Sequence, residues 1–147
     1  MNREFSHGAP IVVRSEGAVR SPRNWTLDEL LALPREDLVP DVSRLDIRRA
    51  GTAVKLSALL DRMDLEPAAT HLTLHSSSDG FAATVPIEAV RETGLLIVAF
   101  DGQPLPPQAG GPSRFFLPEA AACSTAELDA CKNVKFVDRV EVVSLEP

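Results

Sequence analysis

The chain has 147 residues, of which 44% are hydrophobic, a size and composition that suit one domain with a buried core. No run approaches about eighteen consecutive apolar residues, and no basic region followed by an apolar one opens the chain, so we expect neither a membrane-spanning helix nor a targeting segment, and a cytoplasmic location. The formal net charge of −6 argues against nucleic acid or a membrane as a partner, but it leaves room for a local basic pocket.

The first helix has the clearest local signal. Thr26 and Glu29 have the spacing of a capping box, the leucines of residues 27–33 supply an apolar side, and Pro34 ends the helix. Met1 to Gly8 is polar and lacks an apolar period, so we expect a flexible tail over residues 1–8 and one domain over residues 9–147.

The remaining elements follow from apolar periodicity and turn residues. We expect, in chain order, an extended segment over 11–19, a strand over 42–48, a helix over 56–63, strands over 70–75 and 81–85 around a turn at 76–80, a short helix over 87–91, strands over 95–100 and 113–117, a helical turn over 124–131 and a closing strand over 136–143. The run 95–100 is continuously apolar, which predicts a central strand covered on both faces. Strands and short helices mix without a regular βαβ repeat, so the fold class is α+β.

The segment from Asp101 to Pro118 is the most unusual part of the sequence, because a turn, a proline-rich arm, a double glycine and one arginine lie between two apolar runs. Loops that leave a sheet in this way often hold ligands. Gly110 and Gly111 allow either close approach of a ligand or only the φ values of a turn. Arg114 can bind an anion through paired donors, or it can bond to carbonyls of its own loop.

Histidine and cysteine spacings do not form a metal site. His71 and His75 lie four residues apart, but the residues around them alternate with period two and predict a strand. Cys123 and Cys131 lack the CxxC spacing of zinc and thioredoxin-like sites, so ordinary thiols are the first interpretation. A redox pair is a weaker one, because eight residues of helix would separate the two by roughly 12 Å.

Several segments together carry a resemblance to a known family. They are Gly-Gln-Pro-Leu-Pro at 102–106 with Gly-Gly-Pro-Ser-Arg at 110–114, Trp-Thr-Leu-Asp-Glu-Leu at 25–30, Gly-Thr-Ala-Val-Lys-Leu at 51–56, Ser-Asp-Gly-Phe at 78–81 and Asn-Val-Lys-Phe-Val-Asp-Arg-Val-Glu-Val at 133–142. In this order, from about Ile11 to Ser144, the sequence resembles the molybdopterin-binding domain of the sulfite oxidase family. The resemblance implies a single domain of mixed β-sheets with short helices.

The resemblance also implies a cofactor site that binds molybdopterin, the molybdenum cofactor, or another small anionic ligand. Arg114 takes the place of the family's cofactor arginine, and Lys135 that of a lysine beside the cofactor, although a solvated lysine at a strand start is an equal alternative. The residues that the resemblance assigns to the cofactor are Arg114, Lys135, Asn133, Val134, Ser76, Gly110 and Gly111. For Ser76, ordinary turn chemistry is the stronger alternative.

The family's molybdenum-ligating cysteine is missing. The interval where the resemblance places it, Arg35 to Ala50, contains no cysteine, and the nearest positions are Asp46, Ile47 and Arg48. A carboxylate is a hard donor and does not replace a soft thiolate. Two interpretations follow. The first is a non-catalytic module that binds a pterin or another anion; the second is a molybdenum-cofactor oxidoreductase with atypical ligation, for which Cys123 or Cys131 is a candidate ligand, and with a separate electron-transfer partner.

Overall fold

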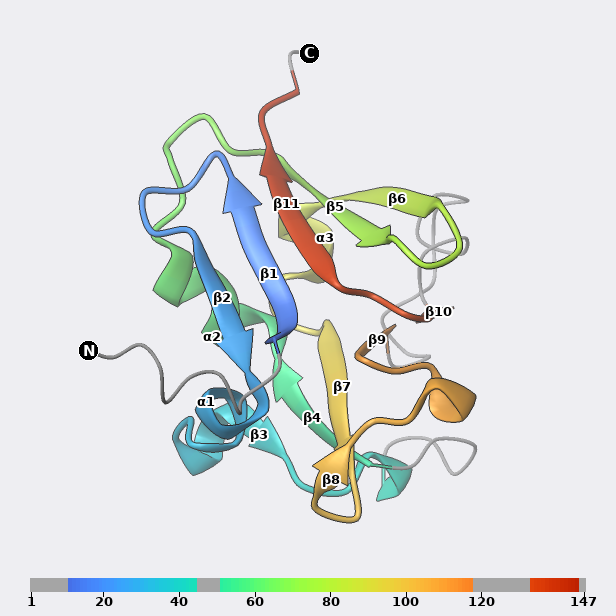
Figure 1. Cartoon of the computed structure of the whole chain (residues 1–147). Helices are drawn as coiled ribbons and strands as arrows, with labels where there is room; N and C mark the ends of the chain where they lie inside the picture. Colours follow the sequence, from blue (N-terminus) through green and yellow to red (C-terminus); the bar gives the residue numbers. More distant parts are fainter. Residues whose placement is uncertain (1–10, 45–50, 118–132, 146–147) are drawn as a thin grey trace, which may run out of the picture.

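The computed structural model describes residues 11–44, 51–117 and 133–145. The tail Met1–Gly8 and the expected helical turn over 124–131, with Cys123 and Cys131, lie outside the described residues. Two sheets form the framework (Figure 1). The first sheet has the order β2-β1-β11-β5-β6, and the second has the order β10-β9-β7-β4-β3, with β8 added beside β7.

The strands of the first sheet are β1 (Ile11–Gly17), β2 (Arg23–Thr26), β5 (His71–Ser76), β6 (Phe81–Pro86) and β11 (Arg139–Val143). β1 and β11 run parallel, and the other neighbours run antiparallel. The second sheet contains β3 (Leu38–Val39), β4 (Thr52–Lys55), β7 (Leu95–Phe100), β8 (Gln103–Pro104), β9 (Arg114–Phe116) and β10 (Asn133–Val134). The mixture of sheets and short helices confirms the predicted α+β class.

The helices are short and begin where the sequence predicts. They are α1 (Leu27–Leu31), α2 (Leu56–Met63) and α3 (Ile87–Val90), with 3-10 turns η2 (Arg35–Asp37), η3 (Val42–Arg44) and η4 (Pro107–Ala109). The capping box of α1 is confirmed: the Glu29 N–H donates to the Thr26 hydroxyl over 3.2 Å, and the Thr26 N–H donates to the Glu29 carboxylate over 2.9 Å. None of the helices in the described ranges combines the length and the apolar character needed to cross a bilayer.

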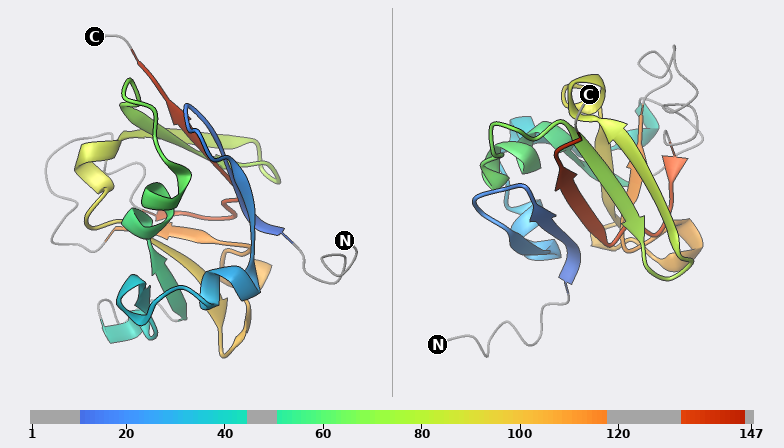
Figure 2. Two further views of the ribbon diagram at one scale, coloured as in Figure 1. Left: turned by 90° about the vertical axis from the view of Figure 1, so that its left-hand side faces the viewer. Right: turned by 90° about the horizontal axis from the view of Figure 1, so that it is seen from above.

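One core joins both sheets and α2. Leucines of α2 pack together with residues of β1, β5 and β11 from the first sheet and of β4, β7 and β9 from the second, and α2 closes one side of the space between the sheets (Figure 2). β7 is the central strand, as predicted. Leu96 and Val98 face this main core, while Leu95 and Ile97 face a smaller cluster with Leu105 and Phe116. β7 is thus covered on both faces, and Leu105 anchors the loop that follows it in the smaller cluster.

Two sequence predictions about strands are wrong in part. Residues 42–44 form a 3-10 turn, because the Asp41 carboxylate accepts hydrogen bonds from the Ser43 N–H (3.0 Å) and hydroxyl (2.6 Å) and so competes with sheet pairing. The Ser43 hydroxyl, followed by the Ser43 N–H, lowers the pKa of Asp41. The closing strand begins at Arg139 and not at Phe136, which has a left-handed φ of 61°.

Candidate cofactor site

The double glycine lies in a tight loop between η4 and β9. Gly110 has a φ of 102°, which favours glycine, and the Gly111 N–H donates to the Pro106 carbonyl over 2.9 Å. A Cβ on Gly111 would stand 1.8 Å from the Leu105 carbonyl oxygen. The space that a Cβ on Gly111 would need is therefore filled by the chain's own backbone, so the loop itself requires a glycine at this position.

Gly110 brings two cationic side chains together. A Cβ at Gly110 would meet Arg114 Cδ at 3.2 Å and Lys135 Cγ at 3.5 Å. The stems of both side chains therefore lie over this glycine, although Arg114 begins β9, Lys135 follows β10 and the two are 21 positions apart in the sequence. The structure thus assembles Gly110, Arg114 and Lys135, three of the residues that the sequence assigns to the cofactor.

The two cations differ in how they are held. Arg114 is half-buried at the start of β9, and its Nη1 donates to the Ala109 carbonyl over 3.4 Å, so it braces the loop as one of the sequence interpretations expects. Lys135 is exposed, and its Nζ lies 5.8 Å from the centroid of the Phe136 ring. The site therefore pairs a positioned guanidinium with an ammonium that reaches solvent.

Phe136 is a residue of this site that the sequence analysis missed. Its left-handed backbone costs about 1–2 kcal/mol for a residue with a Cβ, and it is held by a hydrogen bond of 2.7 Å from the Phe136 N–H to the Gly110 carbonyl. The Val137 N–H then donates to the Ser113 carbonyl over 2.8 Å. These bonds fasten the segment with Lys135 to the loop with Arg114. No residue type in the sequence signals such a conformation for an aromatic residue.

The fully buried Ser113 adds a side-chain hydrogen bond between the same two segments. Its hydroxyl donates to the Val137 carbonyl over 2.6 Å. Ser113→Ala is expected to lower the free energy of unfolding by about 1–3 kcal/mol, because a buried carbonyl loses its donor. Urea denaturation measures this loss, with the exposed Ser78→Ala as the control, expected to change stability by less than about 0.5 kcal/mol. Equal midpoints for the two variants would contradict the assignment.

The other predicted residues are placed differently. Ser76 is buried, and its hydroxyl donates to the Asp79 carboxylate over 2.5 Å, as ordinary turn chemistry would have it. Val134 has its side chain in the core, and both Asn133 and Val134 pair with β9 through the backbone. The Asp138 N–H donates to the His75 carbonyl over 3.0 Å and so joins this region to the end of β5.

Arg139 is held by a network of charged and polar side chains on β1, β5 and β11. Arg139 Nη1 donates to Glu16 over 2.5 Å, and Nη2 donates to His75 Nδ1 over 3.2 Å. The hydrogen bond with Glu16 raises the pKa of Arg139 above its usual value. Because Arg139 only donates, His75 Nδ1 accepts, and its Nε2 donates to Glu141 over 2.9 Å. Arg139 is thus engaged in hydrogen bonds within the chain and is not available to the Gly110 loop.

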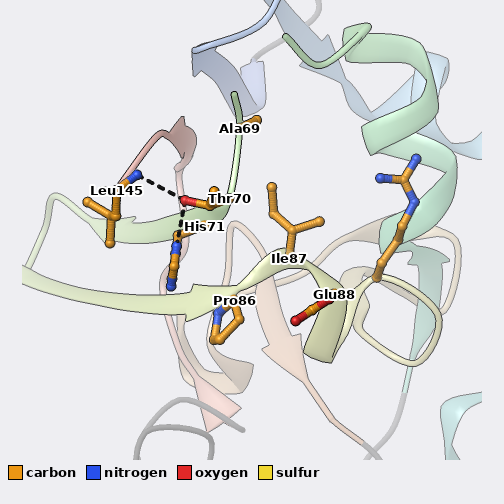
Figure 3. Close-up of a pocket in the computed structure, with 8 residues that line it drawn as sticks. Ala69, Thr70, His71, Pro86, Ile87, Glu88 and Leu145 are labelled. Atoms are coloured by element: carbon orange, nitrogen blue, oxygen red, sulfur yellow. Dashed lines mark hydrogen bonds between the residues drawn. The ribbon is translucent and has the colours of Figure 1, made fainter. Parts of the chain in front are cut away.

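A large groove lies away from the Gly110 loop. A groove of about 830 Å³ lies at the His71 end of β5 (Figure 3). The Gly110 loop is joined instead to the other end of β5, through the segment that bonds to the His75 carbonyl. His71 Nδ1 lies 2.8 Å from the Thr70 hydroxyl, and Arg91, which also lines the groove, donates to Asp61 over 2.8 Å. We place the candidate site at the Gly110 loop because two cationic side chains meet there, whereas this groove is lined by one arginine that is already paired with Asp61.

Metal-ligating side chains do not gather in the described part of the chain. No group of three or more His, Cys, Asp or Glu side chains within residues 11–44, 51–117 and 133–145 is arranged to hold a metal ion. Asp46, Ile47 and Arg48, the nearest positions to the expected cysteine, lie outside the described residues, and both cysteines of the chain do as well.

Comparison with known families agrees with the resemblance seen in the sequence. The profile of the family described as "Oxidoreductase molybdopterin binding domain" matches residues 49–147, more than half of the chain. The chain belongs to this family. The matched range contains all the residues assembled at the Gly110 loop, and it leaves out nearly all of the Arg35–Ala50 interval in which the cysteine is missing.

The fold of this molybdopterin-binding domain family is also found among solved structures. The sulfane dehydrogenase SoxCD from Paracoccus pantotrophus matches with a TM-score of 0.64 and 18% sequence identity, over 92% of this chain. The chain spans 38% of the length of that SoxCD chain. At this identity the match shows a common fold. A search among curated proteins found no match.

The residues at the Gly110 loop fit the pterin part of the family's cofactor better than they fit the molybdenum. The guanidinium of Arg114 and the ammonium of Lys135 suit the phosphate and carbonyl groups of a pterin, and Gly110 leaves room for both stems. For the metal, residues 35–50 contain no cysteine, and within residues 11–44, 51–117 and 133–145 no group of three or more His, Cys, Asp or Glu side chains is arranged to bind it.

Proposed function

We propose that this domain is a non-catalytic binding module that takes a small anionic ligand at the Gly110 loop, with a phosphorylated pterin as the first candidate. The observation that carries the proposal is the meeting of Arg114 and Lys135 over Gly110 in a chain that lacks the cysteine for molybdenum. We propose further that residues 9–147 act as one domain. A cytoplasmic location stays a prediction.

The charge distribution supports an anionic ligand. The whole chain has a net charge of −6, so two neighbouring cations form a local exception that attracts an anion against the average field. The guanidinium of Arg114 offers a planar fork for two oxygens of a phosphate or for a pterin carbonyl. Lys135 adds a second positive charge, and because its side chain is exposed, it can turn toward the ligand without rearranging the core.

The remaining predicted residues would contribute through the backbone or through the shape of the loop. The hydroxyl of Ser76 already donates to Asp79, so an anionic ligand would gain nothing from it in this arrangement. Asn133 and Val134 precede Lys135, and their backbone pairing with Phe116 and Phe115 fixes the position of the Lys135 backbone. The ligand would therefore be held chiefly by Arg114 and Lys135.

The second candidate, a molybdenum-cofactor oxidoreductase with a separate electron-transfer partner, is favoured by the family's description as an oxidoreductase domain. It requires a protein ligand other than the family cysteine, or none. Replacing Cys123 and Cys131 by alanine distinguishes this case: the binding-module proposal predicts that ligand retention is unchanged in both variants, whereas loss of bound metal in one of them would favour the oxidoreductase.

The proposal is tested by titrating the purified protein with a pterin phosphate and with the same pterin without phosphate, following the pterin fluorescence. The phosphorylated compound is expected to bind about tenfold or more tightly, because a charge-assisted contact contributes about 1.5–3 kcal/mol. Its affinity is expected to fall as salt rises. Equal affinities for the two compounds, or no binding of either, would overturn the proposal.

A further inference from the structure

The two sheets end in strands of very different character. β2, at one edge of the first sheet, has four residues, includes the charged Arg23 and leads directly into α1, while β3 and β10 at the edges of the second sheet have two residues each. β6, at the other edge of the first sheet, has six residues (Figure 1). Among the described elements, β6 is therefore the longest edge strand.

Apart from Pro86 at its last position, β6 lacks the usual features that prevent an edge from pairing. Its sequence Phe-Ala-Ala-Thr-Val-Pro has no charged residue, and its pairing with β5 runs through every residue from 81 to 86 without a bulge. Phe81 is 45% exposed, one of the large hydrophobic side chains that the described surface leaves open. Such an edge is a template for another strand.

The register identifies which backbone groups point outward. The Ile87 N–H donates to the Thr70 carbonyl over 3.0 Å, and hydrogen-bonded pairs alternate along an antiparallel ladder. The pairs formed by Val85, Ala83 and Phe81 with β5 therefore use the inward groups. Ala82 and Thr84 then direct both their N–H and C=O groups away from β5, and Pro86, which lacks an N–H, ends the edge.

We infer that β6 pairs with β6 of a second copy of this chain, antiparallel and across a two-fold axis at Ala83, to make one continuous sheet from two first sheets. In this register Ala82 of each copy lies opposite Thr84 of the other, and the two residues exchange both backbone hydrogen bonds. Phe81 of each copy lies opposite Val85 of the other on one face; because Val85 is already buried in the single chain, the newly covered apolar surface comes from the half-exposed Phe81.

A second copy fits this edge because the edge is complementary to itself. The absence of charge on residues 81–86 means that two identical strands meet without like charges opposite each other. Large Phe81 meets smaller Val85, and small Ala83 meets itself at the axis. Pro86 limits the ladder equally at both ends. Pairing along one edge buries little area, so we expect a dissociation constant on the order of micromolar, tightened by salt because each copy has a net charge of −6.

The test is sedimentation velocity on the whole chain over roughly 1 to 500 μM, a range that spans the expected dissociation constant. The wild type is expected to pass from monomer to dimer. Thr84→Pro removes an outward N–H and is expected to abolish the dimer, whereas Thr84→Val, which loses only the hydroxyl contact with Thr73 (2.8 Å), keeps it.

Circular dichroism establishes whether each variant is folded. If Thr84→Pro fails to fold, Phe81→Ser replaces it, because this side chain is already half-exposed in the single chain and its loss is expected to weaken dimerisation at least tenfold. A wild-type chain that stays monomeric throughout the range, or a dimer that survives in folded Thr84→Pro or Phe81→Ser, would overturn the inference.

Discussion

Gly111→Ala is expected to destabilise the protein by about 3 kcal/mol or more, one of the largest effects that a single methyl group produces here. The added Cβ would stand 1.8 Å from the Leu105 carbonyl oxygen and 3.0 Å from that of Pro106. Both are backbone atoms, and Leu105 is buried in the smaller core cluster, so the loop has little freedom to retreat. The loss should appear as a lower midpoint in urea denaturation.

Gly80→Ala is the matched control for this prediction. Gly80 has a φ of 67°, but a Cβ there would meet no atom within 4 Å, so only the backbone conformation is penalised, by about 1–2 kcal/mol. Gly111 has no left-handed φ, so Gly111→Ala lacks this backbone penalty, and any loss beyond that of Gly80→Ala is a lower bound on the steric term at Gly111. If Gly111→Ala cost no more than Gly80→Ala, the close approach of the Leu105 backbone would be contradicted.

The second large effect concerns binding. Lys135→Met is expected to weaken pterin phosphate binding by about tenfold, and the double variant with Arg114→Met by about a hundredfold or more, because each removes a charge-assisted contact while keeping an apolar stem. Lys135→Met should leave stability unchanged, since Lys135 is exposed. The double variant should also be less stable, because Arg114 braces the Ala109 carbonyl.

Arg20→Met serves as the control for this loss of charge. Arg20 is exposed and forms a surface ion pair with Asp64 over 3.3 Å, far along the chain from the Gly110 loop. Arg20→Met removes one positive charge, as Lys135→Met does, and is expected to change the dissociation constant for pterin phosphate by less than about twofold. An Arg20→Met protein that bound as weakly as Lys135→Met would point to a general charge effect and away from a site at Lys135.

Local signals allowed much of the fold to be predicted. The capping box at Thr26 and the leucine spacing of residues 56–63 identified α1 and α2, and the continuous apolar run over 95–100 identified β7 as the central strand. These features depend on residues close together in the sequence. The strand β4 and the turn at Val42 were not predicted, because pairing with β7 and the hydrogen bonds to Asp41 decide them.

The candidate site was also only partly predictable from the sequence. The order of its motifs indicated that Arg114 and Lys135 belong together, and the structure brings them to the same glycine. The sequence left open whether Gly111 faces a ligand, since the answer depends on the path of the backbone six residues earlier. It also gave no signal for the left-handed Phe136, which depends on a hydrogen bond to Gly110 across the fold.

We propose that the domain keeps the anion-binding half of a molybdopterin site without the metal. The decisive measurement is of released pterin and molybdenum, per chain, in protein purified from a host that makes the molybdenum cofactor. We expect bound pterin with far less than stoichiometric molybdenum. One molybdenum per chain, retained through purification, would contradict it.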